Sequence, residues 1–323
     1  MGLGLIGGSV ARRLAPAHDV VGWDADPRTR ELAVRAGLRV AGSVQEAAAG
    51  ADVAIVATPL GAVATVLTAL STSDCRVVTD VGSVKGPVLA AARAAGLGDR
   101  FVGGHPMAGT EQAGFTAADP ALLDGAAWVL CLEDDTDLAA WLTVAALATG
   151  AGCRVVPCSA AAHDEAQARV SGLPHLLAVA LATAGAEGGP LAAALAAGSF
   201  RDGTRVAGTR PELIAALCDG NRTALATVLD TTLARLADAR DALRDGRSVM
   251  PLATAGHRAR RDWADPRPTV AEHLDPRASS FRDDLLDLGA AGGSVHAVRP
   301  DGTLHCQRPD LADRPEPDEL LPG

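Results

Sequence analysis

The side chains that could do chemistry stand in short polar segments between apolar, glycine-rich stretches. Ser83 and His105 each follow a predicted strand, and loops at the carboxyl ends of parallel strands face the ligand crevice of an open α/β sheet. His105 lies between Gly104 and Pro106, on a stiff loop of the kind that fixes an imidazole in one orientation. A fixed imidazole can serve as a general base near neutral pH.

A second histidine and an arginine stand in similar segments further along the chain. His175 lies in an apolar run, and Arg205 follows Asp202 by three residues. Each of these residues by itself also fits a structural role, His175 as a hydrogen-bonded core histidine and Arg205 as the partner of Asp202 on one helical turn. Likewise, Ser83 could cap the helix that follows it, and Glu111 could be a solvated loop acid.

A glycine loop at the start of the chain predicts a dinucleotide site. Gly2, Gly4 and Gly7 have the G-x-G-x-x-G spacing, which permits a tight turn, close approach of a pyrophosphate and close packing of the next helix. Asp24 lies 20 residues after Gly4, where a carboxylate accepts hydrogen bonds from the adenosine ribose. This acid favours NAD, and the nearby Arg28 leaves NADP as the less favoured alternative.

Only Met1 precedes this loop, whereas the fingerprint ordinarily follows the central strand of the sheet. Without that strand, two neighbouring strands would expose their edges and the loop would lose its anchor. We therefore expect the first strand of the domain to be missing and the N-terminus to be incomplete.

The apolar pattern divides the chain into three parts. Residues 1–155 alternate short β-like runs with alanine-rich helical runs, which predicts a Rossmann-like, doubly wound parallel sheet. The strand signal then stops, and residues 156–285 predict an all-helical domain for substrate binding and dimerisation. Residues 286–323 predict a tail with one small hairpin around the turn at 299–302.

The composition argues against a nucleic-acid partner. The chain has 39 acidic and 29 basic residues, a formal net charge of −10, and 2% aromatic residues with no tyrosine. Such a surface repels phosphate backbones, and it offers few rings for base stacking.

The cysteines and the apolar runs predict a cytoplasmic protein. The six cysteines are scattered and form no CxxC pair, so we expect reduced thiols and no metal site. The most apolar stretch, residues 173–200, is broken by Gly-Gly-Pro at 188–190 and fits two buried helices better than a membrane span. The apolar N-terminus lacks the basic region that begins a signal peptide.

Taken together, the polar segments resemble the prephenate/arogenate dehydrogenase family. With the glycine loop they cover about two-thirds of the chain, from Gly2 to about Arg222. The histidine and arginine strings are much more specific to the family than the glycine loop. The shared strings are ATPL at 57–60, DVGSVKG at 80–86, GGHPMAGTE at 103–111, LPH at 173–175 and FRDGTRVAGT at 200–209.

The resemblance implies an oxidative decarboxylation in tyrosine biosynthesis. NAD⁺ takes a hydride from C4 of prephenate, the ring carboxylate leaves as CO₂, and the product is 4-hydroxyphenylpyruvate. With arogenate as the substrate, the product is tyrosine. The resemblance also implies a homodimer formed through the helical domain, which agrees with its many apolar positions.

The resemblance assigns a role to each polar residue. His105 accepts the hydrogen bond of the 4-hydroxyl and helps take its proton, and Ser83 positions that histidine and the hydroxyl near the nicotinamide. Arg205, oriented by Asp202, binds a substrate carboxylate, since a guanidinium recognises carboxylates bidentately. The residues that line the pocket and its entrance are His175 and Glu111. The cofactor-binding residues are Gly2, Gly4, Leu5, Ile6, Gly7, Asp24, Thr58 and Pro59.

Besides the missing first strand, the chain departs from the family pattern in three places. Gly172 stands where the family often has a histidine, which puts the fine detail of the pocket in doubt. A tryptophan common after the arginine string is replaced near Ile214. The segment beyond about residue 285 is too short for the ACT regulatory domain of some relatives, so we expect no feedback control by that route.

Two other functions fit parts of the sequence. A β-hydroxyacid dehydrogenase is expected to carry a catalytic lysine in its helical domain, whereas Lys85, the only lysine in the sequence, lies in the first domain. A degenerate, non-catalytic paralogue with impaired cofactor binding would account for the missing strand. The presence of Ser83, His105, His175 and Arg205 argues against that alternative.

Overall fold

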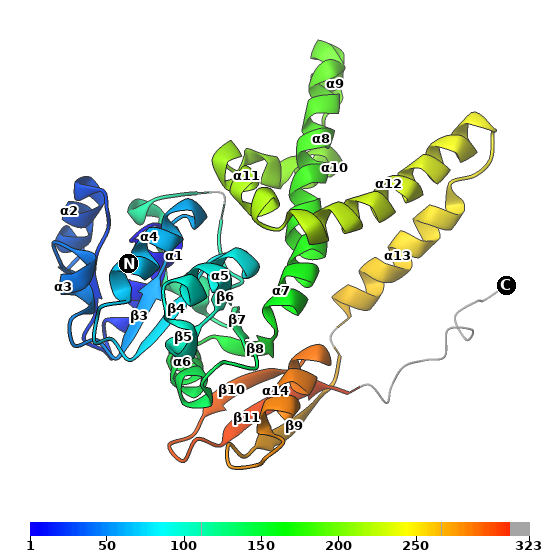
Figure 1. Ribbon diagram of the computed structural model, residues 1–323. Helices are drawn as coiled ribbons and strands as arrows, with labels where there is room; N and C mark the ends of the chain where they lie inside the picture. Colours follow the sequence, from blue (N-terminus) through cyan, green and yellow to red (C-terminus); the bar gives the residue numbers. More distant parts are fainter. Residues whose placement is uncertain (111, 266, 311–323) are drawn as a thin grey trace.

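The computed structural model describes residues 1–110, 112–265 and 267–310. The chain builds an α/β part, continues into projecting helices, and then returns to the α/β part (Figure 1). The first α/β segment contains α1 (Leu5–Leu14), β1 (Val21–Gly22), α2 (Pro27–Arg35), β2 (Arg39–Val40), α3 (Val44–Ala48), β3 (Val53–Val56), α4 (Leu60–Leu70), β4 (Val77–Asp80), α5 (Gly86–Ala94), η1 (Gly98–Arg100), β5 (Phe101–Val102), β6 (Gly104–Pro106), η2 (Phe115–Ala117), η3 (Pro120–Leu123), β7 (Ala127–Cys131), α6 (Leu138–Gly150) and β8 (Arg154–Cys158).

The projecting helices and the returning segment follow in chain order. The helices are α7 (Ala160–Gln167), η4 (Ala168–Gly172), α8 (Leu173–Glu187), α9 (Gly189–Leu195), α10 (Gly198–Thr204), η5 (Arg205–Gly208), α11 (Pro211–Gly220), α12 (Arg222–Arg244) and α13 (Met250–Ala264). The returning segment contains β9 (Thr269–Leu274), α14 (Phe281–Ala290), β10 (Ser294–Val298) and β11 (Leu304–Pro309).

The predicted Rossmann-like domain with parallel strands, followed by a helical domain, is confirmed. β1 pairs in parallel with β2, β3 with β4, β4 with β5, and β7 with β8. Every residue of β4 is buried, as expected for a parallel strand with helices on both faces. This explains why the strand could be recognised as a continuous apolar run that ends in polar residues.

The gap expected in the parallel sheet lies between β1 and β3. These two strands belong to separate sheets, of order β1-β2 and β3-β4-β5. Met1 and Gly2 lie between the sheets, where the Met1 ammonium donates to the Ile55 carbonyl at 2.8 Å and the Gly2 N–H donates to the Trp23 carbonyl at 2.7 Å. The Ala57 N–H in turn donates to the Met1 carbonyl at 2.6 Å. The first residues thus join the two sheets where the glycine loop begins.

The prediction that the chain ends in a tail after residue 285 is wrong for the described residues up to 310. β10 and β11 form the expected hairpin, and β10 also pairs with β8 in a sheet of order β6-β7-β8-β10-β11-β9. The expected boundary cuts α14, whose Phe281, Leu285 and Leu288 are buried in the same core as Trp141 of α6. The segment folds back because this apolar face covers β8. Residues 311–323 lie outside the described residues.

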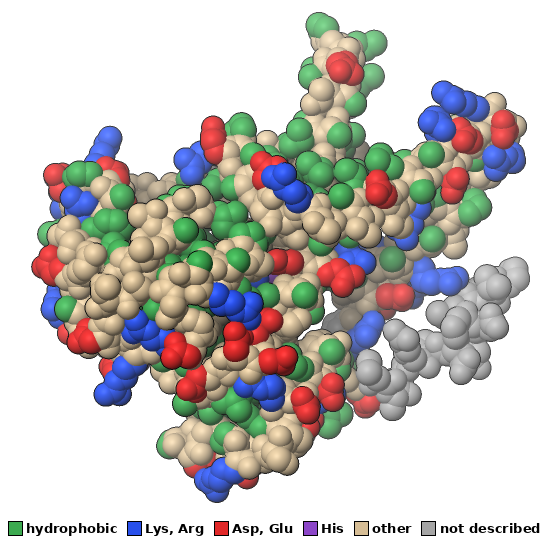
Figure 2. Space-filling view, viewed as in Figure 1, with side chains coloured by type: hydrophobic (Ala, Val, Ile, Leu, Met, Phe, Trp, Pro, Cys, Tyr) green, Lys and Arg blue, Asp and Glu red, His purple; other side chains and the backbone are tan. Residues whose placement is uncertain are grey.

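The helices that follow β8 are continuous and apolar but are not buried within the chain. The Gly-Gly-Pro signal ends α8 at Glu187, as the sequence predicts, and α9 starts at Gly189. Within the single chain the expected burial is absent at the end of this run, because Leu191 and Leu195 are 71% and 73% exposed. Figure 2 shows hydrophobic side chains gathered along the projecting α8 and α9. By length and composition alone, the run Ala160–Glu187 could span a membrane.

Candidate active site

A buried ion pair fixes the loop that follows β4. Asp80, the last residue of β4, contacts the ammonium of Lys85, and both side chains are buried. Asp80 also accepts hydrogen bonds from the Gly82 N–H at 2.8 Å and the Gly104 N–H at 2.9 Å, while Lys85 donates to the Gly104 carbonyl at 2.6 Å. Buried charges are tolerated when they are paired and hydrogen-bonded. The pair therefore ties the loop 81–84 to the first residue of β6.

His105 stands in the middle of β6, directly after that anchor. Position 104 must be glycine, because a Cβ there would lie 2.5 Å from the Asp80 carbonyl oxygen. Nδ1 of His105 lies 2.9 Å from Nε2 of His163, and the two rings meet edge to face with centroids 5.1 Å apart. Burial lowers the pKa of His105 well below 6.5, and the positive charge of Lys85 acts in the same direction. The imidazole is therefore a neutral base at neutral pH.

The partner of His105 belongs to a second polar group, built on α7. Nδ1 of His163 lies 2.7 Å from the carboxylate of Asp164, which also accepts hydrogen bonds from the Lys85 and Gly86 N–H groups, both at 2.8 Å. Asp164 thus caps the start of α5 from another helix, where a carboxylate is favoured by the exposed N–H groups. Burial acts to raise the pKa of Asp164, but the hydrogen bonds from His163, Gly86 and Lys85 outweigh it and the pKa is lowered.

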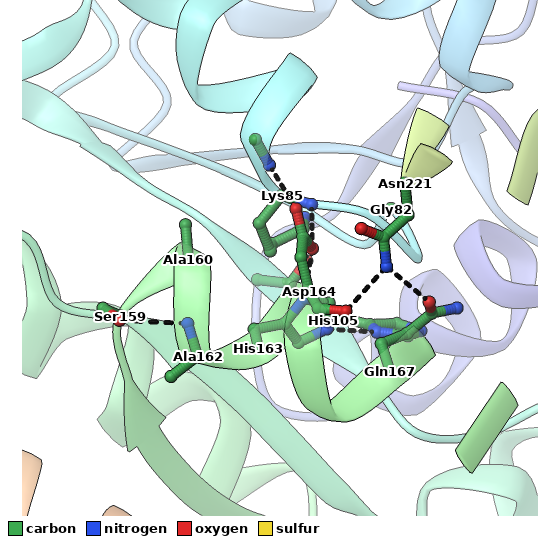
Figure 3. A network of polar contacts seen from close by, with 12 residues as sticks. Gly82, Lys85, His105, Ser159, Ala160, Ala162, His163, Asp164, Gln167 and Asn221 are labelled. Atoms are coloured by element: carbon green, nitrogen blue, oxygen red, sulfur yellow. Dashed lines mark hydrogen bonds and ion pairs between the residues drawn. The ribbon is translucent and has the colours of Figure 1, made fainter. Parts of the chain in front are cut away.

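Asn221 connects these residues to the start of α12. Its amide nitrogen donates to the backbone carbonyl of Asp164 at 2.6 Å and to the side-chain oxygen of Gln167 at 3.1 Å. Figure 3 shows the Lys85, His105, His163 and Asp164 side chains converging between the sheet and α7, with Asn221 bridging from α12. The sequence reasoning missed His163, Asp164 and Asn221. A His-Asp pair on the first helix after the predicted parallel sheet could have pointed to the first two, whereas no such pattern marks Asn221.

The predicted residues Ser83, His175 and Glu111 lie in different parts of the chain. Ser83 lies in the loop fixed by Asp80 and Lys85, next to the buried Val84. Nδ1 of His175 lies 2.8 Å from the Ser171 carbonyl, and because a carbonyl only accepts, Nδ1 carries a hydrogen. Glu111 lies outside the described residues.

The arginine string lies on the projecting helices. Arg205 begins η5, which packs on α8, and its side chain is exposed. Within the described part of the chain no ion pair joins it to Asp202, so the orientation of Arg205 by Asp202 stays a prediction. α10 ends at Thr204, so Asp202 lies on α10 and Arg205 on η5.

The glycine loop has the shape that a dinucleotide requires. Gly2 has a φ of +85°, and a Cβ there would lie 2.5 Å from the Ala57 carbonyl oxygen. A Cβ on Gly7 would lie 1.9 Å from the Gly2 carbonyl oxygen, whereas one on Gly4 would meet no atom within 4 Å. Gly2 and Gly7 are thus required by the fold, and Gly4 leaves open space at the start of α1. The backbone N–H groups of the first turn, on Leu5, Ile6 and Gly7, have no partner within the helix.

Two further polar groups border the loop. The carboxylate of Asp24 accepts the Leu3 N–H at 2.7 Å and the Asp26 N–H at 2.9 Å, which holds it beside the loop with lone pairs still free. The hydroxyl of Thr58 is buried without a partner among the described residues, and Pro59 precedes the first residue of α4. An orphaned hydroxyl, a carboxylate and free helical N–H groups around an open glycine fit a dinucleotide.

Two family models match consecutive parts of the chain. The nucleotide-binding domain of prephenate dehydrogenase matches residues 8–157, and the dimerization domain of prephenate dehydrogenase matches residues 159–250. The junction between them falls beside α7, so the bond between His105 and His163 crosses from one matched domain to the other.

Named proteins agree with these domains. A prephenate dehydrogenase of Lactococcus lactis subsp. cremoris is 33% identical over 64% of this chain and 60% of its own length, so the chain spans about three-fifths of that relative. A cyclohexadienyl dehydrogenase of Zymomonas mobilis is 32% identical over 80% of this chain and 93% of its own.

Solved structures resemble the whole fold. A Corynebacterium glutamicum protein provisionally named a prephenate dehydrogenase has a TM-score of 0.84 and 37% identity, with 91% of this chain and 96% of that chain covered. The prephenate dehydrogenase of Aquifex aeolicus, solved with hydroxyphenyl propionate and NAD⁺, has a TM-score of 0.73 and 26% identity, with 82% and 96% covered. By its two domains and its relatives, this chain belongs to the prephenate dehydrogenase family.

Proposed function

We propose that this chain catalyses the oxidative decarboxylation of prephenate to 4-hydroxyphenylpyruvate. The observation that carries the proposal is the position of His105 at the junction of the nucleotide-binding and dimerization domains, where its Nδ1 lies 2.9 Å from Nε2 of His163. Burial at this place lowers the pKa of His105. A substrate that gives up a hydride must reach the nucleotide and lose its hydroxyl proton in one place. A base at this junction satisfies that requirement.

Each side chain around the junction has its own role in the proposed reaction. His105 accepts the proton of the 4-hydroxyl, which becomes more acidic as the C4–H bond breaks, and such assistance typically accelerates a reaction about 10²–10⁴-fold. Ser83, on the loop locked by the buried ion pair, orients the hydroxyl. Arg205 binds a substrate carboxylate, and its exposed position leaves the guanidinium free to do so. His175 lines the pocket, with Nδ1 held by the Ser171 carbonyl.

The residues of the glycine loop would hold NAD⁺, which supplies the hydride acceptor when bound. The first-turn N–H groups of α1 would bind the pyrophosphate, and Asp24 would bind the ribose hydroxyls. The charge of Asp24 would repel the 2′-phosphate of NADP, which supports NAD as the preferred cofactor. Arg28 is the second residue of α2 and is exposed. Its positive charge near Asp24 keeps NADP as the alternative cofactor to be assayed.

The second candidate substrate is arogenate, which differs from prephenate in carrying an amino group in place of the side-chain keto group. The relative named a cyclohexadienyl dehydrogenase favours testing both. Steady-state assays with each substrate and each nicotinamide cofactor, followed by the absorbance of the reduced nicotinamide, decide between them. No turnover in any combination would favour the degenerate paralogue instead.

The variant His105→Asn tests the role of the base. We expect kcat to fall about 10²–10⁴-fold with nucleotide binding unchanged, because an amide cannot take the proton. His18→Asn, an exposed histidine in the same domain, is the matched control and should keep full activity. An unchanged kcat in His105→Asn would remove that residue from the mechanism.

We infer that the protein acts as a homodimer formed through its projecting helices. The matched dimerization domain and the exposed leucines of α8 and α9 support this arrangement. A second copy would also cover apolar side chains of α8 such as Leu177 and Leu181, which are 39% and 44% exposed.

A further inference from the structure

A chain of hydrogen bonds runs behind the base, from His105 through His163 to Asp164. The first link joins Nδ1 of His105 to Nε2 of His163 at 2.9 Å, and the second joins Nδ1 of His163 to the Asp164 carboxylate at 2.7 Å. His163 is buried, and the side chain of Asp164 is 14% exposed. Water therefore has little access to the links, so each ring nitrogen depends on its neighbour for a partner.

The direction of these hydrogen bonds follows from Asp164, the last residue of the hydrogen-bonded series. Asp164 accepts two backbone N–H groups, from Lys85 and Gly86, so its oxygens act there as acceptors. An ionised carboxylate can only accept, so Nδ1 of His163 carries the hydrogen of the second link. A neutral imidazole has one N–H, which leaves Nε2 of His163 as an acceptor. Nδ1 of His105 must then carry a hydrogen, and Nε2 of His105 is left unprotonated.

We propose that His163, held by Asp164, is a positioning residue that fixes the tautomer of His105 so that its Nε2 is the base. This inference rests on the proposed function of His105. Nε2 of His105 makes no hydrogen bond within the described residues, so it is free for the substrate hydroxyl. When His105 gains a proton, its Nδ1–H bond to His163 becomes charge-assisted and stronger, and the Asp164 carboxylate supports it.

The proton and the electrons balance in the step that this tautomer serves. The hydroxyl proton moves to Nε2 of His105, the C4–H electron pair leaves as hydride to the nicotinamide, and the oxygen becomes a carbonyl. Loss of the ring carboxylate as CO₂ then returns an electron pair to the ring and leaves a phenolate. Nε2 of His105 returns its proton to that phenolate oxygen, so the histidine ends the cycle neutral.

The tautomer can be measured without any substrate. ¹⁵N-labelled histidine in the full chain, observed above the ordinary imidazole pKa of about 6.5, distinguishes a protonated from an unprotonated ring nitrogen. The signals are assigned by their loss in His105→Asn and His163→Gln. We expect His105 to carry its hydrogen on Nδ1. A hydrogen on Nε2 of His105, as a doubly protonated His163 would impose, overturns the proposal.

Two variants at position 163 separate positioning from packing. His163→Leu removes the acceptor, and we expect kcat to fall about 10²-fold with KM unchanged. His163→Gln places an amide oxygen near the former Nε2, so it should still accept a hydrogen bond from His105. We therefore expect its kcat to be at least tenfold higher than that of His163→Leu. Equal loss in both variants, or no loss in either, would overturn the role of His163.

A matched control and the substrate-free measurement keep the two proposals apart. Glu165→Gln removes the neighbouring carboxylate, which is exposed and paired with Arg169 at 3.0 Å, and should leave kcat unchanged. If the ¹⁵N signals show Nδ1–H on His105 but neither prephenate nor arogenate is turned over, the proposed function fails while the tautomer stands. If turnover is normal and the tautomer is reversed, the positioning role fails alone.

Discussion

Replacing Lys85 by methionine should destabilise the nucleotide-binding domain strongly, although it exchanges one long side chain for another of similar length. Lys85 and Asp80 are fully buried and contact each other. Removing one partner of a buried pair leaves an uncompensated charge, which typically costs about 3–5 kcal/mol. Asp80 would keep its hydrogen bonds from the Gly82 and Gly104 N–H groups, so we expect the free energy of unfolding to fall by about 3 kcal/mol, the lower end of that range.

The assay is urea unfolding followed by tryptophan fluorescence. Trp128 is buried beside Gly104, and its Nε1 would lie 3.0 Å from a Cβ at position 104. Its emission therefore reports on the region that the Asp80–Lys85 pair holds in place. The control is Arg93→Met, which breaks the Arg93–Asp135 pair, whose side chains are 50% and 54% exposed. That surface pair should contribute at most about 1 kcal/mol to the free energy of unfolding.

The double variant Asp80→Asn with Lys85→Met tests the reason for the loss. Because it leaves no buried charge, its free energy of unfolding should fall by less than the sum of the two single losses. A loss in Lys85→Met no larger than in Arg93→Met would refute the reasoning, since the buried ion pair would then add no more than an exposed one.

Three further outcomes are expected. Leu191→Glu should shift the protein from dimer to monomer in light scattering, whereas Val34→Glu, on α2 and 57% exposed, should not; a dimer that persists would contradict the proposed interface. Gly4→Ala should weaken nucleotide binding in titration calorimetry without loss of stability, because its Cβ meets no atom of the protein, and Gly256→Ala on α13 is the control. The rate should stay constant as pH falls from neutrality through 6.5 and decline only below, because burial lowers the pKa of His105 and the base must be unprotonated; a decline centred at 6.5 would speak against this environment.

Much of the site could be predicted from the sequence because its signals are local. Asp24 and Ser83 follow predicted strands, and the glycine spacing and the segment around His105 are runs of a few consecutive residues. The strand–helix alternation likewise follows from apolar runs a few residues long. The helix break at 188–190 could be predicted from Gly-Gly-Pro alone.

The tertiary structure decided the contacts between segments far apart in the chain. His163 lies 58 residues from His105, and its role depends on the packing of α7 against β6, for which no short motif exists. The same holds for Lys85 and Asp80, whose burial comes from backbone groups of β6.

The C-terminal segment shows the same division. A hairpin could be predicted from a turn at 299–302, but its place beside β8 depends on a strand more than a hundred residues earlier. The conformation of a turn depends on a few consecutive residues. Strand pairing and the burial of charge depend instead on which surfaces meet after the chain has folded.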